Sequence, residues 1–108
     1  MKNNFSKELK KIVTQIVKKY KPEKIILFGS YAYGKPKESS DVDLVIIKKS
    51  KKRFGARLFE VARFIHSSLG TDILVYTPEE WEKGLKEDYY FFKEIQSKGK
   101  VIYEKPRS

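Results

Sequence analysis

Apolar residues near the N-terminus recur every three or four positions, and lysines occupy many of the positions between them. The apolar members of this repeat are Phe5, Leu9, Ile12, Val13, Ile16, Val17 and Tyr20. This spacing places them on one face of a helix and predicts an amphipathic helix that packs on a sheet. Pro22 follows closely, and because proline cannot continue a helix, we expect the helix to end before it.

Three short apolar runs follow, and each has the length and borders of a buried strand. They cover residues 25–28, 43–47 and 72–76, and a fourth strand at 101–103 is expected at a sheet edge. A second helical stripe lies between the second and third runs, and we expect Gly70 to end that helix. Its members are Leu58, Val61, Ala62, Ile65 and Leu69.

Two more helices are predicted in the C-terminal part of the chain. Thr77, Pro78 and Glu80 form the pattern of a capping box, in which Glu80 reaches back to the backbone amide of Thr77. Residues 88–97 form the other helix, and Gly99 ends it. These helices and strands predict an α/β (α+β) protein, and the length fits a single domain over residues 1–108.

The composition narrows the classes of function. The chain has 24 Lys and Arg against 14 Asp and Glu, a formal net charge of +10 and no cysteine. Disulfides and thiolate metal sites are therefore excluded, and because no long apolar run or leader pattern occurs, we expect a cytoplasmic protein without a membrane partner. The charge suits nucleotides, RNA or an acidic protein, but lysine-rich surfaces are also typical of heat-adapted proteins, so nucleic-acid binding is not favoured on charge alone.

The turn after the first strand is the first candidate site. Gly29 would let the backbone approach a phosphate, and the Ser30 hydroxyl could donate a hydrogen bond to it. A simple turn would explain the same two residues. The P-loop pattern that continues to Gly34 and Lys35 fails, because Pro36 stands where a Ser or Thr must bind Mg²⁺.

Paired aspartates form the second candidate site. Asp41 and Asp43 stand at the head of the second strand, and the strand period points both to one face, about 6 to 7 Å apart. Two such carboxylates repel each other unless a cation lies between them. Asp72 opens the next strand and could join the pair, although it could also be an ordinary strand-end residue. We therefore predict Asp41, Asp43 and Asp72 as Mg²⁺ ligands and catalytic residues.

The segments Phe28–Gly34 and Ser40–Leu44 closely resemble the minimal nucleotidyltransferases of the DNA polymerase β superfamily. They combine Gly-Ser, ten intervening residues and Asp-x-Asp, and Thr71–Val75 is similar to the family's third-carboxylate strand. The resemblance covers nearly all of the chain. It implies a nucleotidyltransferase fold, with a small mixed sheet of three to four strands flanked by helices.

The resemblance also implies that a nucleoside monophosphate moves from an NTP, usually ATP, to an acceptor, with release of pyrophosphate. In that reaction the Gly-Ser pair would hold the triphosphate, and the three aspartates would bind two Mg²⁺ ions. The usual Arg or Lys of the loop is replaced by Tyr33 here. Lys35 and Lys37 are then the candidates for the cation that pairs with the phosphates.

Many minimal proteins of this kind resemble the antitoxin partner of an all-helical HEPN ribonuclease toxin. This implies AMP transfer to a tyrosine of the toxin, within a hetero-oligomer. Transfer to RNA or to a small molecule, and a nucleotide-binding module that inhibits its partner sterically, are the alternatives. His66 is interpreted as structural, and the aromatic run 89–92 is interpreted as core rather than as a contact surface.

Overall fold

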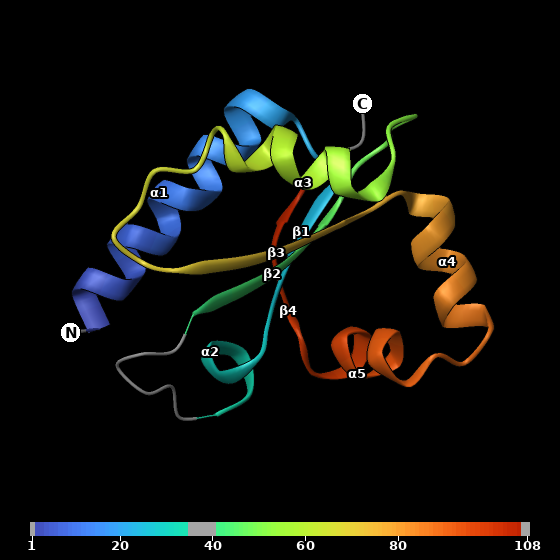
Figure 1. Ribbon diagram of the computed structural model, residues 1–108. Coiled ribbons are helices and arrows are strands. Elements are labelled where there is room, and N and C mark those ends of the chain that lie inside the picture. The colour runs from blue at the N-terminus through green and yellow to red at the C-terminus, as the bar shows by residue number, and fades with distance from the viewer. Residues whose placement is uncertain (1, 35–40, 107–108) are drawn as a thin grey trace.

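The computed structural model describes residues 2–34 and 41–106, which form a sheet with helices on both of its faces (Figure 1). In chain order the elements are α1 (Lys2–Tyr20), β1 (Lys24–Phe28), α2 (Ser30–Tyr33), β2 (Val42–Ile47), α3 (Phe54–Ala62), β3 (Thr71–Tyr76), α4 (Pro78–Lys86), α5 (Tyr90–Lys98) and β4 (Lys100–Glu104). The strand order is β3-β2-β1-β4. Strand β1 is antiparallel to β2 and β4, whereas β2 and β3 are parallel, so the predicted mixed sheet is confirmed.

Each face of the sheet has its own hydrophobic core. Helices α1 and α3 cover one face, where Ile12, Ile16 and Val61 are completely buried. Helices α4 and α5 lie on the other face, which they cover with Trp81 and Ile95. The period of three and four residues along each helix therefore translates directly into the two layers that flank the sheet. No helix in the described ranges is long and apolar enough to cross a membrane.

The capping box predicted at the start of α4 is present and is part of a larger polar contact. The Thr77 hydroxyl accepts a hydrogen bond from the Glu80 backbone N–H at 3.1 Å, and a Glu80 carboxylate oxygen accepts one from the Thr77 N–H at 2.8 Å. Arg57 of α3, only 5% exposed, donates to both Glu80 oxygens and to the Val75 carbonyl. Glu80 thus joins α3 to α4 as well as capping α4.

The helix after β2 is shorter than its apolar stripe predicts. Helix α3 ends at Ala62, and the residues that continue the stripe lie in a non-helical segment. The Gln15 side chain explains this end, because it donates to the His66 carbonyl at 3.0 Å and accepts from the His66 N–H at 2.9 Å. A helix through His66 would use these backbone groups itself. The prediction that Gly70 ends a helix is therefore wrong.

The aromatic run that follows α4 was predicted to be core, and this is wrong for three of its four members. Phe92 is partly buried against Trp81, with the two rings stacked at 4.8 Å. Tyr89, Tyr90 and Phe91 are exposed. The reason is helix geometry, because α5 places only one stripe of its surface on the sheet and adjacent residues cannot share that stripe.

Candidate active site

Asp43 and Asp72 lie opposite each other in the sheet. They are register partners in the parallel pair β2–β3. Strand alternation places Val45 and Ile47 on the same face as Asp43, and both contribute to the core beneath α4 and α5. Both aspartates therefore point to the α4/α5 face of the sheet, close to the C-terminal end of β1.

The two carboxyl groups interact directly. The pKa of Asp43 is raised above its ordinary value, first because the group is partly buried, then because the Asp72 charge is close, the two side chains share a hydrogen bond, and Asp41 adds a weaker repulsion. Asp72 itself is exposed. Asp43 thus feels both of the other predicted carboxylates, Asp72 on the neighbouring strand and Asp41 just before β2.

Asp41 lies just before β2 and leans towards the segment that leads into β3. Its carboxylate rests against Gly70, where an added Cβ would come 3.0 Å from the Asp41 Cγ. The Val42 N–H also donates to the Gly70 carbonyl at 2.8 Å. Gly70 therefore leaves space for a carboxylate, which is a different role from the helix end predicted for it.

Gly29 forms the other wall of the site. Its φ of 75° lies in the region that favours glycine, and an added Cβ would overlap the Asp43 carboxylate. The short helix α2 begins at Ser30, and its first turn is closed by hydrogen bonds from Ala32 and Tyr33 to the Gly29 carbonyl. The predicted Gly-Ser turn is therefore in contact with the predicted carboxylates, although the two are separate in sequence.

Part of the predicted site cannot be placed. Lys35 and Lys37, the candidates for the cation beside the phosphates, lie outside the described residues. Within residues 2–34 and 41–106, no three acidic or histidine side chains converge closely enough to hold a metal ion as a finished cluster. The roles of Gly29, Ser30 and the three aspartates in binding and catalysis thus remain predictions.

Comparison with known proteins decides the family. The family model described as "Polymerase beta, Nucleotidyltransferase" matches residues 10–108. The chain belongs to this nucleotidyltransferase family. The predicted resemblance is thereby confirmed at the level of the family, and the protein is a nucleotidyltransferase.

Two relatives of this nucleotidyltransferase come from Methanocaldococcus jannaschii, and each is named "putative protein adenylyltransferase". One is 36% identical over 93 residues, which is 86% of this chain and 90% of the relative. The other is 28% identical over 102 residues, 93% of this chain and 99% of the relative. A crystal structure of a "putative nucleotidyltransferase" from Sulfolobus solfataricus shares the fold, with a TM-score of 0.64 and 22% identity over 92% of this chain and 79% of that one.

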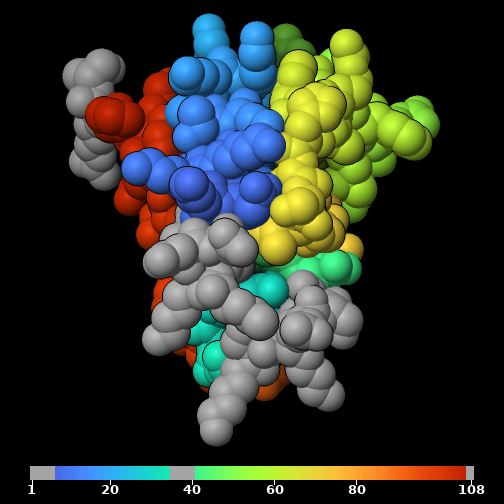
Figure 2. Space-filling view, turned by 90° about the vertical axis from the view of Figure 1, so that its left-hand side faces the viewer, coloured from blue at the N-terminus to red at the C-terminus, as the bar shows by residue number. Residues whose placement is uncertain are grey.

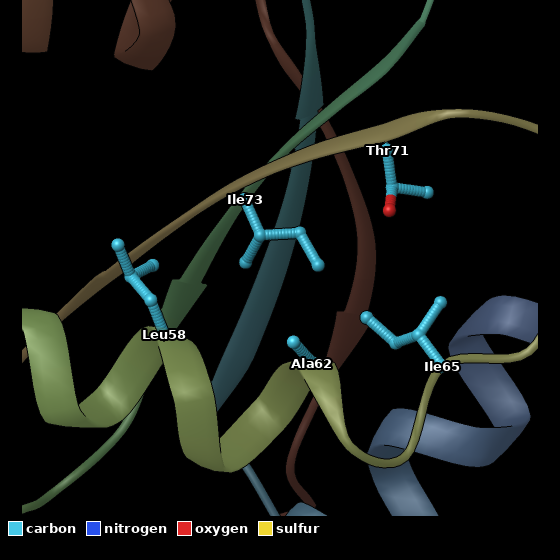
Figure 3. A pocket seen from close by; sticks show the side chains of 5 residues that line it. All are labelled: Leu58, Ala62, Ile65, Thr71 and Ile73. Carbon is cyan, nitrogen blue, oxygen red and sulfur yellow. The ribbon is translucent and has the colours of Figure 1, made fainter.

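An apolar hollow lies on the other face of the sheet and is separate from the carboxylates. Figure 3 shows Leu58 and Ala62 of α3 facing Thr71 and Ile73 of β3, with Ile65 beyond the end of the helix; the hollow measures about 220 Å³. Because side chains alternate along β3, Thr71 and Ile73 point to the opposite face from Asp72. The hollow therefore adds no group to the nucleotidyltransferase site.

Proposed function

We propose that this nucleotidyltransferase transfers AMP from ATP to a tyrosine hydroxyl of a partner protein, a HEPN-type ribonuclease toxin, and acts as its antitoxin. The observation that carries the transfer chemistry is the pairing of Asp43 with Asp72 beside Gly29. The names of the relatives from M. jannaschii support a protein acceptor. A HEPN-type partner is the part of the proposal that follows from the resemblance of the motifs.

Mg²⁺ is the proposed cofactor, as two ions, and the donor set suits it. Carboxylate oxygens are the ligands that Mg²⁺ takes in proteins, and Asp41, Asp43 and Asp72 supply them. The raised pKa of Asp43 points the same way, because it reports partly buried negative charges that a cation would neutralise. When bound, the ions would stabilise the charge on the attacking and leaving oxygens of the displacement.

The residues of the chain would position the substrates. Because Gly29 has no side chain, its backbone can lie against the Asp43 carboxylate. The Ser30 hydroxyl would donate a hydrogen bond to a phosphate oxygen. The acceptor oxygen attacks the α-phosphorus, the bond to the oxygen that bridges to the β-phosphorus breaks, and pyrophosphate leaves. Asp72 is exposed on an edge strand, where it can meet an incoming hydroxyl and take its proton.

The test uses ATP labelled at either the α- or the γ-phosphate, together with Mg²⁺ and a purified HEPN-type partner. We expect label only from the α-position on the partner, on a tyrosine identified by mass spectrometry, and none with Asp43→Ala. Label from the γ-position would make the protein a kinase. A tight inhibitory complex that forms equally with Asp43→Ala and without transfer would replace the enzyme by a steric inhibitor.

One observation favours RNA as a second candidate acceptor. A hollow of about 320 Å³ lies between α1 and the segment after α3, and its lining includes the basic residues Lys18, Lys19 and Arg63 together with His66. Figure 2 shows α1 (blue) beside this segment (yellow) on one face of the molecule. Transfer of α-label to RNA, without transfer to the partner protein, would identify RNA as the acceptor. Replacement of Lys18, Lys19 and Arg63 would then weaken the binding of RNA.

A further inference from the structure

An aromatic surface borders the carboxylates on the side of α5. Phe28, the last residue of β1, is the register partner of Asp43 in the antiparallel pair β1–β2. Side chains directly opposite each other in such a pair lie on the same face. Phe28 accordingly packs with the core beneath α4 and α5, and its side chain leaves the sheet beside that of Asp43.

Phe91 of α5 extends this surface to solvent. Its ring packs edge-on against Phe28, with the centroids 5.8 Å apart and the planes at 90°. Even so, Phe91 is 42% exposed, so much of the ring is available for another contact. Phe91 is thus held in place by Phe28, the register partner of Asp43, and part of its ring remains at the surface.

Tyr33 of α2 lies on the same border. Its backbone N–H donates a hydrogen bond to the Gly29 carbonyl at 3.0 Å. Burial first, and then the nearby charges of Glu94 and Asp43, raise the pKa of its hydroxyl. Glu94 is three residues after Phe91, so the two share one side of α5. Tyr33 is therefore next to Gly29, near enough to Asp43 and Glu94 to feel both charges, and it is 40% exposed.

We propose that Phe28, Tyr33 and Phe91, here called the aromatic wall, form the subsite for the base of the nucleoside triphosphate, with Phe91 as the main stacking surface. This inference rests on the proposed function, which places the triphosphate at Gly29, Ser30 and the carboxylates. The base must then lie within one nucleoside length of that point. The aromatic wall borders the proposed triphosphate site on this side. An aromatic side chain can stack on any of the nucleotide bases.

The chemistry of the wall predicts how the nucleotides rank. Stacking energy grows with the apolar area that is covered, so the larger purine rings gain more from Phe91 than pyrimidines do. Nothing in this contact reads the hydrogen-bonding edge of the base. ATP and GTP should therefore bind with similar affinity, and both should bind more tightly than CTP and UTP.

The test compares the binding of Mg-ATP and Mg-tripolyphosphate by calorimetry, because tripolyphosphate has the phosphates but lacks the base. We expect Phe91→Ala to weaken ATP about 10-fold and to leave tripolyphosphate unchanged, since ring-to-base stacking has about this effect in other proteins. Phe91→Tyr should restore ATP binding. Tyr90→Ala is the matched control, because Tyr90 is the neighbouring residue of α5 and is 75% exposed.

Other outcomes separate the failure of this inference from that of the proposed function. Equal affinity of the wild-type protein for ATP and tripolyphosphate, or unchanged ATP affinity in Phe91→Ala, would overturn the base subsite and leave the transfer reaction in place. Parallel loss of both ligands in Phe91→Ala would show a merely structural role. No binding of either ligand by the wild-type protein would overturn the subsite and the proposed function together.

Discussion

Asp43 and Asp72 are register partners across the parallel strands β2 and β3, and partial burial together with the nearby Asp72 charge raises the pKa of Asp43. Two carboxyl groups this close are electrostatically unfavourable once both are ionised. The arrangement therefore costs stability in the absence of a cation, which is a common property of sites whose ligand or substrate supplies the missing charge.

The first prediction is that Asp43→Asn stabilises the metal-free protein and abolishes transfer. The pKa of Asp43 is higher in the folded protein than in the unfolded chain, so its ionisation opposes folding. This cost is absent below the ordinary aspartate pKa of about 4, and it develops as the pH rises through the raised value. At pH 7 the unfolding temperature of metal-free Asp43→Asn should exceed that of the wild type by a few degrees. This difference should shrink as the pH is lowered towards 4.

Asp88→Asn is the control for this prediction, because Asp88 is an exposed aspartate that pairs with Lys93 at 2.6 Å. It should give no gain, and Mg²⁺ with ATP should raise the unfolding temperature of the wild type but not that of Asp43→Asn. A lower unfolding temperature for metal-free Asp43→Asn at pH 7 would contradict the prediction.

The second prediction concerns Gly29→Ala, which should lower stability by about 1 to 3 kcal/mol and eliminate transfer. A β-carbon would be strained at a φ of 75°, and it would overlap the Asp43 carboxylate. Urea unfolding and the labelled-ATP assay measure the two effects. Gly34→Ala at the other end of α2 is the control, since a Cβ at Gly34 meets no atom of the described residues within 4 Å.

The third prediction is a pH dependence of stability at the junction of α3 and α4. Hydrogen bonds from Arg57, and then the Thr77 amide, lower the pKa of Glu80 in the folded protein. The stabilisation is therefore complete above the ordinary glutamate pKa of about 4.3, and it disappears as the pH falls through the lowered value.

Glu80→Gln should accordingly lower the free energy of unfolding at pH 7 by about 1 to 2 kcal/mol, because the buried Arg57 loses its counter-charge. The effect stays moderate because the Glu80 side chain is partly open to solvent. The difference from wild type should vanish at low pH. Glu79→Gln, at the adjacent exposed position, should have little effect at any pH. A constant difference across the pH range would show that charge is not the cause.

The fourth prediction is that Gln15→Ala loosens the segment after α3. Two hydrogen bonds between the Gln15 side chain and the His66 backbone would be lost, at a cost of about 1 to 2 kcal/mol. Amide hydrogen exchange should accelerate over residues 64–70 and remain slow in β2. Thr14→Ala is the matched control, because the Thr14 hydroxyl donates to the Lys10 carbonyl within α1.

The sequence predicted the features that depend on short stretches of chain. The strands expected at 25–28, 43–47 and 72–76 are present, each beginning one residue earlier than expected. The capping box at Thr77 and the edge strand near Val101 are present as well. These features depend on residues that are close in sequence. Side chains repeat every two residues in a strand and every three to four in a helix, and a cap or a turn involves a few adjacent residues.

Other features were missed because their causes are distant in sequence. The end of α3 at Ala62 depends on Gln15, and the space at Gly70 depends on Asp41. The exposure of Phe91 depends on which stripe of α5 faces the sheet. No local signal in the segments themselves distinguishes these outcomes from the predicted ones.

The sequence by itself determined the family, the elements and the residue types that suit nucleotide chemistry. The tertiary structure alone decided that β2 and β3 are parallel and in a register that pairs Asp43 with Asp72, with Gly29 and Phe28 beside them. Strand register is set by packing of both faces of the sheet at once, since a shift by one residue would turn every side chain to the opposite face. A site assembled across three strands is therefore a property of the folded chain.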